Sequence, residues 1–163
     1  MQIETKRLII CLLSNDEMQK IIDSEENQEM KQAYTEMLDG CIKSPEYRIW
    51  NAIWIMKLKD IPDTTIGDLS FKGLGTDGTV EIGYGIKKEF EGKGFMTEAV
   101  TAMSVWASQQ EGVFSVEAET DANNIASQKV LQKAGFIPNG IIGAEGPRYI
   151  WKGKYCWQSR PNH

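Results

Sequence analysis

The sequence predicts a single α/β (α+β) domain built around one mixed β-sheet. Its 163 residues fall within the range of about 100–200 that one domain usually occupies. Strand patterns follow one another in the middle of the chain and alternate with helix patterns later, which is typical of a sheet covered by helices. With 41% hydrophobic and 25% charged residues, the composition is that of an ordinary globular protein. No internal repeat, low-complexity stretch or linker divides the sequence.

The first quarter of the chain predicts a strand followed by two helices. Residues 7–13 form an apolar run, which indicates a strand. Ser14, with Glu17 three positions later, forms a capping box, so a helix is expected from there to about residue 23. A second, polar helix is expected over residues 28–38, where a glycine follows closely.

The middle of the chain predicts three successive strands. Residues 47–58 carry β-branched and aromatic side chains on both faces, which indicates a central strand. Residues 61–64, Ile-Pro-Asp-Thr, predict a turn before a strand over residues 65–72. The Asp-Gly pair within residues 73–78 favours a hairpin loop that leads into a strand over residues 79–86.

The second half of the chain alternates between helix patterns and strand patterns. A helix is expected over residues 94–110, where apolar residues recur at helical spacing, and a strand over residues 113–120. Asparagine capping predicts a helix from residue 123 or 124 to residue 134, with a glycine directly after it. Two strands, over residues 136–142 and 148–158, complete the sheet.

The composition excludes several classes of chemistry. A formal charge of −5 argues against broad binding to nucleic acid, although a local basic groove for a phosphorylated ligand stays open. Cys11, Cys41 and Cys156 are far apart, so neither a disulfide framework nor a zinc site is expected, and a reducing cytoplasm is the expected location. The single histidine, His163, disfavours triad catalysis and multi-histidine metal sites. With no signal core and no apolar run near 18 residues, no membrane partner is expected.

The segment between the strand over residues 79–86 and the following helix carries the most information. Gly92 and Gly94 lie just before the helix, where free backbone amides and the helix dipole favour an anion such as a phosphate or pyrophosphate. The P-loop pattern fails, because no Ser or Thr follows Gly92-Lys93. The dinucleotide pattern fails because its third glycine is missing. A tight turn that only packs helix on strand is the structural alternative.

Two glycines on one strand face support the ligand interpretation. Glu81, Gly83 and Gly85 share a face because side chains alternate along a strand. Glycine weakens a strand, so two in close succession indicate a bulge or the close approach of a ligand. This face would leave backbone uncovered by side chains next to a carboxylate, so that a ligand could approach it.

Three segments together resemble the GNAT superfamily of acyl-CoA-dependent N-acetyltransferases, most closely the branch of ribosomal-protein (Rim-type) N-acetyltransferases. Residues 3–10 resemble the opening strand of that branch. Residues 81–99 resemble its pyrophosphate-binding motif, and residues 124–136 resemble its second cofactor motif. The order of elements also matches, so the resemblance spans nearly the whole chain.

The resemblance implies one acyltransferase domain over residues 1–160 with a tail over 161–163. Its mixed, mostly antiparallel sheet of about seven strands would splay between residues 79–86 and 113–120, with helices on both faces. Acetyl-CoA would be the co-substrate and no metal would be needed; the protein would be a monomer or a homodimer. The residues expected to bind the cofactor are Tyr84, Gly85, Ile86, Gly92, Lys93, Gly94, Phe95, Met96, Thr97, Asn124 and Ser127.

The reaction implied is acetyl transfer to a primary amine by direct attack in a ternary complex. The candidate bases are Asp68, Glu81, Glu117 and Glu119, and Glu81 is favoured because related enzymes carry a strand glutamate near this place. Ser127 is expected to hydrogen-bond the departing sulfur. The acceptor stays open between a protein N-terminus, an amino acid, a polyamine and an amino-bearing antibiotic.

The sequence departs from the family pattern at several positions. Glu91 replaces a frequent Gln or Arg in the loop, and Met96 replaces a small residue. Leu131 stands where many members have a tyrosine that acts as an acid, so that residue has no such role here. Glu91 and the missing tyrosine support an alternative, a non-catalytic acyl-CoA-binding module on the same fold.

Overall fold

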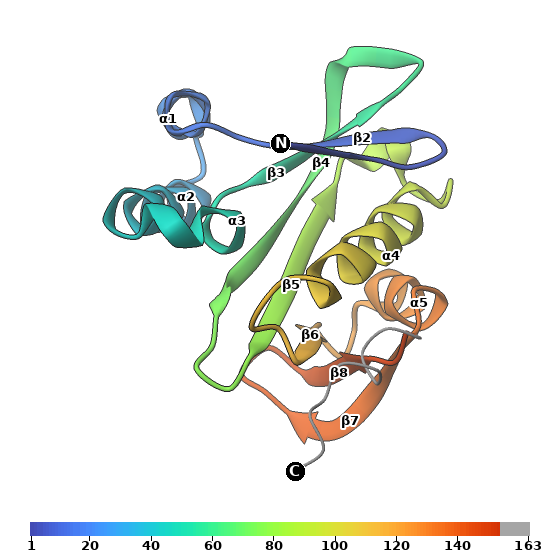
Figure 1. Cartoon of the computed structure of the whole chain (residues 1–163). Helices are drawn as coiled ribbons and strands as arrows, with labels where there is room; N and C mark the ends of the chain where they lie inside the picture. The colour runs from blue at the N-terminus through green and yellow to red at the C-terminus, as the bar shows by residue number, and fades with distance from the viewer. Residues whose placement is uncertain (154–163) are drawn as a thin grey trace.

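A computed structural model describes residues 1–153 of the chain (Figure 1). The end of the strand predicted over residues 148–158 and the tail over residues 161–163 lie outside the described residues, as do Cys156 and His163. In chain order the helices and strands are β1 (Gln2–Glu4), β2 (Leu8–Leu12), α1 (Asn15–Ser24), α2 (Gln28–Lys43), η1 (Pro45–Tyr47), α3 (Arg48–Asn51), β3 (Trp54–Leu58), β4 (Ile61–Leu74), β5 (Thr79–Ile86), η2 (Lys88–Phe90), α4 (Phe95–Ser108), β6 (Ser115–Glu119), α5 (Ile125–Lys133), β7 (Phe136–Ile142) and β8 (Pro147–Trp151).

The strands of the described residues form one eight-stranded sheet in the order β1-β2-β3-β4-β5-β6-β8-β7. Each neighbouring pair is antiparallel except β5 and β6, which run parallel and are connected through α4. The predicted mixed, mostly antiparallel sheet is therefore confirmed. The additional strand is β1, a three-residue strand that pattern reasoning did not predict.

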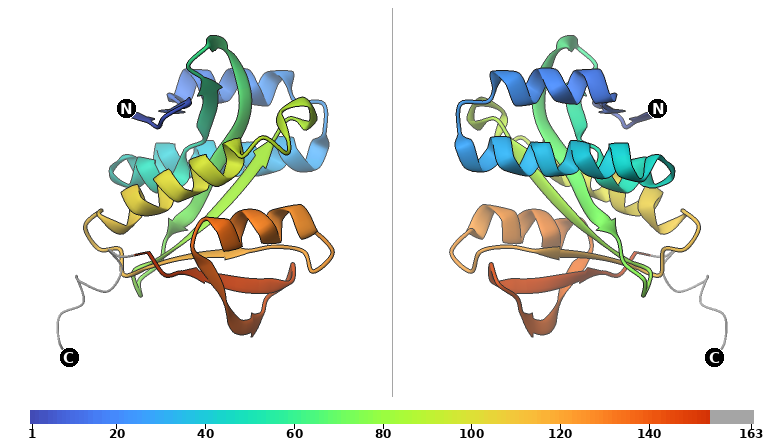
Figure 2. Two further views of the ribbon diagram at one scale, coloured as in Figure 1. Left: turned by 90° about the vertical axis from the view of Figure 1, so that its right-hand side faces the viewer. Right: turned by 90° about the vertical axis from the view of Figure 1, so that its left-hand side faces the viewer.

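The sheet opens between β5 and β6. These two strands pair at three positions, and the last is Glu81 opposite Glu117. On its other side, β5 stays paired with β4 as far as Ile86. The end of β5 therefore diverges from β6, as the resemblance implied. Figure 2 shows α4 and α5 covering one side of the sheet and α1 and α2 covering the other.

The prediction of a strand over residues 47–58 was wrong in its first half. The chain there forms the η1 turn and the short helix α3 before β3 begins at Trp54. Trp50 of α3 is buried and packs edge-on against Phe71 at 5.1 Å and beside Trp106 at 5.4 Å between ring centres. Such aromatic contacts contribute about 0.5–1.5 kcal/mol each beyond burial. Tertiary packing here outweighs the local β-propensity.

Two further boundaries differ from the expectation. The predicted turn at residues 61–64 is the beginning of β4, and the chain reverses instead at residues 59 and 60. Pro62 is tolerated because it is exposed and lies in an irregular part of the β3–β4 pairing, between Ile61, which pairs with Leu58, and Thr65, which pairs with Lys57. Helix α2 continues past Gly40 to Lys43. A Cβ at Gly40 would lie 3.4 Å from Asn51 Cγ, so this glycine allows α3 to approach closely.

The segment over residues 3–10, which resembled a single opening strand, is a hairpin. Ile3 of β1 pairs with Ile10 of β2. The Thr5 N–H donates to the Leu8 carbonyl, and the Leu8 N–H donates to the Thr5 hydroxyl, each at 3.0 Å. The side chain of Thr5 therefore closes the turn, and Arg7 projects from it.

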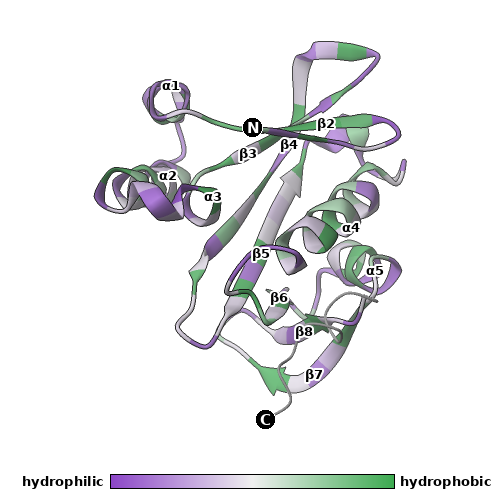
Figure 3. Cartoon of the chain, in the orientation of Figure 1, coloured by the Kyte–Doolittle hydropathy of each residue, from purple (hydrophilic) through white to green (hydrophobic). Residues whose placement is uncertain are grey.

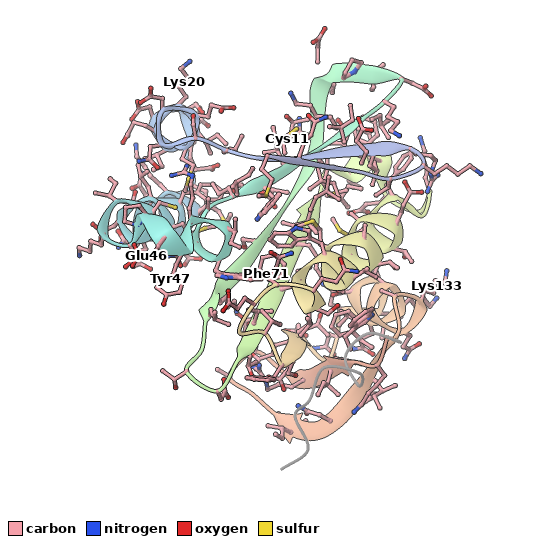
Figure 4. All side chains as sticks on the ribbon, in the orientation of Figure 1. Cys11, Lys20, Glu46, Tyr47, Phe71 and Lys133 are labelled. Carbon is pink, nitrogen blue, oxygen red and sulfur yellow. The ribbon has the colours of Figure 1, made fainter. Side chains whose placement is uncertain are left out.

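A continuous apolar core lies between the sheet and α4. Trp54, Phe71 and Met103 are buried there, and the Trp54 and Trp106 rings pack at 5.0 Å. Figure 4 shows Phe71 near the centre of the molecule. In Figure 3 much of α1 and α2 is hydrophilic, whereas hydrophobic residues follow β2. This core fixes α4, and with it the loop that begins the helix.

Candidate functional site

The loop before α4 has the backbone geometry that its glycines predict. Gly92 and Gly94 have φ angles of 73° and 80°, in the left-handed region that L side chains rarely adopt. Gly94 is the N-cap of α4, and the Glu98 N–H makes the first helical bond, to the Gly94 carbonyl. The amides of the three preceding residues have no acceptor within the helix, so this end of α4 favours an anion.

A groove of about 460 Å³ lies between this loop, the end of β5 and the first turns of α5. Ten of the eleven residues that were predicted to bind the cofactor line it. Those ten are Tyr84, Gly85, Ile86, Gly92, Gly94, Phe95, Met96, Thr97, Asn124 and Ser127. Lys93 is the exception: its side chain is not part of the lining, and its carbonyl accepts a hydrogen bond from Arg7 at 3.0 Å.

Sequence reasoning missed several residues of the lining on α5. Ala126, Lys129, Val130 and Lys133 face the groove from successive turns of this helix. Their spacing of three and four residues was the available signal, because such residues share one helix face. Lys133 projects from the outer end of α5 in Figure 4. The two lysines give the groove a local positive charge in a protein of net charge −5.

Glu91 also lines the groove and is exposed. A carboxylate beside a phosphate group is unfavourable in Coulombic terms, but exposure to water screens it strongly. Met96 is buried and packs into the core beneath the helix start, so the larger side chain at this position does not obstruct the loop. Leu131 is fully buried, so the position that carries a tyrosine in many family members is part of the core here.

Ser127 and Tyr84 meet across the open part of the sheet. The Tyr84 hydroxyl lies 2.8 Å from Ser127 Oγ and 3.3 Å from the Ser127 carbonyl oxygen. Burial raises the pKa of Tyr84, and the hydrogen bond with Ser127 offsets this in part. Asn124 caps α5, since its side-chain oxygen accepts from the Ser127 N–H at 3.0 Å. The cap thus places Ser127 in the first turn of α5, facing β5.

Glu81 lies at the last pair before the sheet opens, but it does not line the groove. Its two oxygens are engaged by Lys72 at 2.6 Å and by Arg148 at 2.8 Å. Arg148 also binds Glu119 at 2.9 Å and lies 3.8 Å from Glu117. Burial lowers the pKa of Arg148, but its bonds to these carboxylates outweigh burial and raise it. Three of the four candidate bases therefore surround one arginine.

Asp68, the fourth candidate, does not line the groove either, but its environment differs from that of Glu81. It lies on β4 opposite Gly85, and its Oδ1 is 3.5 Å from the place that a Gly85 Cβ would occupy. Its Oδ2 accepts a hydrogen bond from the Tyr34 hydroxyl of α2 at 3.3 Å. Burial raises the pKa of Asp68, which the bond from Tyr34 only partly offsets. Burial, and then the charge of Asp68, raise the pKa of Tyr34 to about 12, so Tyr34 stays a donor.

A sheet that opens beside a glycine loop and a helix start defines the class of the fold, that of an acyltransferase domain of the GNAT type. The sequence profile of the acetyltransferase (GNAT) domain matches residues 4–137 of this chain. The chain therefore belongs to the GNAT acetyltransferase family, a family of enzymes.

Two curated proteins of Bacillus subtilis (strain 168) are similar in sequence. The uncharacterized N-acetyltransferase YjdG is 36% identical over 87 residues, which are 53% of this chain and 51% of YjdG. A second protein, named "Probable N-acetyltransferase YjcK", is 38% identical over 81 residues, which are 48% of this chain and 45% of YjcK. The chain thus aligns with about half the length of each relative.

Solved structures share the fold at low sequence identity. The ribosomal-protein-S5-alanine acetyltransferase of Vibrio fischeri has a TM-score of 0.70 and 17% identity, with 92% of this chain and 94% of that chain covered. A ribosomal L7/L12 alpha-N-protein acetyltransferase, RimL, in complex with coenzyme A has a TM-score of 0.71 and 14% identity, with 92% and 97% covered. Spermidine N-acetyltransferase SpeG of Vibrio cholerae has a TM-score of 0.67 and 13% identity, with 90% and 94% covered.

Residues 1–153 contain neither a membrane-spanning helix nor a metal-binding cluster. None of the helices there is long and apolar enough to cross a membrane. No group of three or more His, Cys, Asp or Glu side chains in that part of the chain could hold a metal ion.

Proposed function

We propose that this protein is an acetyl-CoA-dependent N-acetyltransferase that acts on a primary amine by direct attack in a ternary complex. One observation carries the proposal: the residues expected to bind the cofactor, which are far apart in the sequence, line one groove at the opening of the sheet. A bound pyrophosphate is stabilised by free backbone amides and by positive charge. The left-handed glycine turn, the start of α4 and two lysines supply both. A thioester supplies the activated acetyl group.

The end of β5 is proposed to hold the pantetheine arm of acetyl-CoA. Residues 82–86 continue beyond the last pair with β6, so their backbone groups on this side can bond to an extended ligand as a strand would. The backbone amides here can also polarise the thioester carbonyl as negative charge develops on its oxygen. Gly85, which lines the groove, keeps the approach to this backbone free of a side chain.

Asp68 is proposed as the general base in preference to Glu81. The amine must lose a proton before it can attack. A free lysine amine has a pKa of about 10.4 and an α-amine has a pKa of about 7.8. At neutral pH an α-amine therefore depends less on a general base. Both oxygens of Glu81 are already held in ion pairs, one with Lys72 and the other with Arg148. Asp68 Oδ2 is held by Tyr34, and its Oδ1 lies next to the bare backbone of Gly85. Partial burial also raises the pKa of Asp68, which makes this carboxylate a better proton acceptor than an ordinary aspartate.

Ser127 is proposed to hydrogen-bond the departing sulfur. When the Tyr84 hydroxyl donates to Ser127 Oγ, the serine proton is directed away from Tyr84 and is available to the thiolate. Tyr84 thus orients the serine, and the two residues together take the place of the absent tyrosine at position 131.

Ser127→Ala is expected to lower turnover by about three- to tenfold, the scale of one lost hydrogen bond, while leaving acetyl-CoA affinity nearly unchanged. Ser108→Ala, the same change at the last residue of α4 and outside the groove, is the matched control, because the Ser108 hydroxyl donates to the Val105 carbonyl of its own helix. Steady-state kinetics with a good acceptor, together with calorimetry, measures both effects. Equal turnover of Ser127→Ala and the parent would leave Ser127 with no role beyond the start of α5.

A further inference from the structure

The turn between β1 and β2 lies against the loop that begins α4. Arg7 Nη1 donates to the Lys93 carbonyl at 3.0 Å, and its Nε donates to Glu98 Oε1 at 3.0 Å. Its guanidinium lies 4.4 Å from the centre of the Phe95 ring. One side chain from the N-terminal hairpin therefore contacts the glycine turn, the first helical residue and the first turn of α4.

Glu98 is held from the hairpin by more than this ion pair. Its Oε2 accepts from the Thr5 hydroxyl at 2.6 Å and from the Arg7 N–H at 3.0 Å. Burial by itself would raise the pKa of Glu98, but the bonds from Thr5 and Arg7 and the charge of Arg7 outweigh it and lower the pKa. Glu98 therefore stays ionised at neutral pH, and the whole contact persists.

This contact offsets an electrostatic repulsion at the start of α4. A carboxylate in the first turn of α4 would repel an anion bound to the same helix end, unless a cation neutralises it. Arg7 provides that cation within hydrogen-bond distance. Arg7 also fixes the Lys93 carbonyl between two glycines in left-handed conformations. Glycine leaves the backbone the greatest freedom, so an outside contact is needed to hold one conformation.

We propose that Arg7 is a positioning residue for the pyrophosphate half of acetyl-CoA. It acts through the loop: it holds the peptide groups of Gly92 to Gly94 in the binding conformation and neutralises Glu98. The N-terminal hairpin is then part of the cofactor site, although the Arg7 side chain does not line the groove. This inference rests on the proposed use of acetyl-CoA, and it assigns the hairpin a share of the affinity.

Arg7→Gln separates this role from a general structural one. We expect the dissociation constant of coenzyme A to rise about fivefold, while the affinity for pantetheine, which lacks the pyrophosphate, stays unchanged. In kinetics, KM for acetyl-CoA rises with kcat unchanged, and KM for acetyl-pantetheine stays the same. Arg7→Lys, which keeps the charge but loses the fork that reaches two partners, is expected to lie in between.

Lys6→Gln is the matched control, because Lys6 is exposed in the same turn and the change removes the same charge. It is expected to leave both affinities unchanged. Equal coenzyme A affinity of Arg7→Gln and the parent, or an equal loss for coenzyme A and pantetheine, would overturn the proposal. Failure of the parent to bind coenzyme A at all would instead contradict the proposed function. Melting temperatures of all variants report whether the fold is retained, and if Arg7→Gln does not fold, Arg7→Lys carries the same comparison of coenzyme A with pantetheine.

Discussion

Asp68→Asn is expected to lower the rate of acetyl transfer by about a hundredfold or more, the usual scale of general base catalysis, and to leave acetyl-CoA binding intact. Asparagine can still accept the bond from Tyr34, so the surroundings of the side chain are retained. The loss should shrink as the pH rises, because the solution then supplies the neutral amine. A pH–rate profile of kcat/KM for both proteins measures this. A loss that is constant across pH would indicate that Asp68 positions the substrate instead.

Asp68→Asn should lower the rate of acetyl transfer, but it should keep or raise the stability of the fold. Because the fold raises the pKa of Asp68, the folded state favours its neutral form. The stability contributed by this group is full below the pKa of the unfolded chain and is lost as the pH rises through the folded pKa. Above the folded pKa the ionised Asp68 therefore opposes folding, and Asn, which carries no charge, should hold or raise Tm there.

Glu81→Gln provides the matched comparison at the other candidate base. It removes the charge that binds both Lys72 and Arg148, so the free energy of unfolding should fall by about 1–3 kcal/mol. Its turnover should stay close to that of the parent. A hundredfold loss in a folded Glu81→Gln protein, with little loss in Asp68→Asn, would show that Glu81 is the base and would contradict our preference.

Gly94→Val is expected to weaken acetyl-CoA binding by at least tenfold, about 1.4 kcal/mol. The φ of 80° is strained for valine, and an added Cβ would lie 3.4 Å from Arg7 Nη2, so the loop must change its conformation. Gly140→Val is the matched control: its φ is 83°, a Cβ there meets nothing within 4 Å, and it lies on β7 rather than in the groove. Calorimetry on both variants separates backbone strain from loss of the site. Unchanged affinity in a folded Gly94→Val protein would remove the glycine loop from the cofactor site.

Much of the fold could be predicted because its signals are local. The capping box of Ser14 and Glu17 is present as expected, and Asn124 caps α5. The chain over residues 47–51 could not be predicted in this way, because its helix depends on the contact of Trp50 with Phe71 and Trp106, which are distant in sequence. The β1–β2 hairpin was missed because three residues carry too little periodicity.

The candidate site, like the fold, combines local sequence signals with contacts between residues that are distant in sequence. The glycines identified the loop in advance, since their position before a helix reflects backbone geometry, whereas the start of α5 was expected in the site only because of the family resemblance. Which carboxylates are held by an arginine could not be read from the sequence. Glu81 lies on β5 and Glu117 and Glu119 lie on β6, and only the fold brings Arg148 between them. The hydroxyl pair of Tyr84 and Ser127 also joins residues 43 positions apart.

The most direct test of the proposed activity is a thiol-release assay with acetyl-CoA and pooled primary amines, with acetylated products detected by mass. The pools cover peptide N-termini, amino acids, polyamines and amino-bearing antibiotics. We predict that free coenzyme A and one acetylated amine form in equal amounts with the parent, and that Asp68→Asn abolishes most of this release. Clear binding of acetyl-CoA by the parent with no transfer to any amine in the panel would contradict the enzyme and favour the binding module.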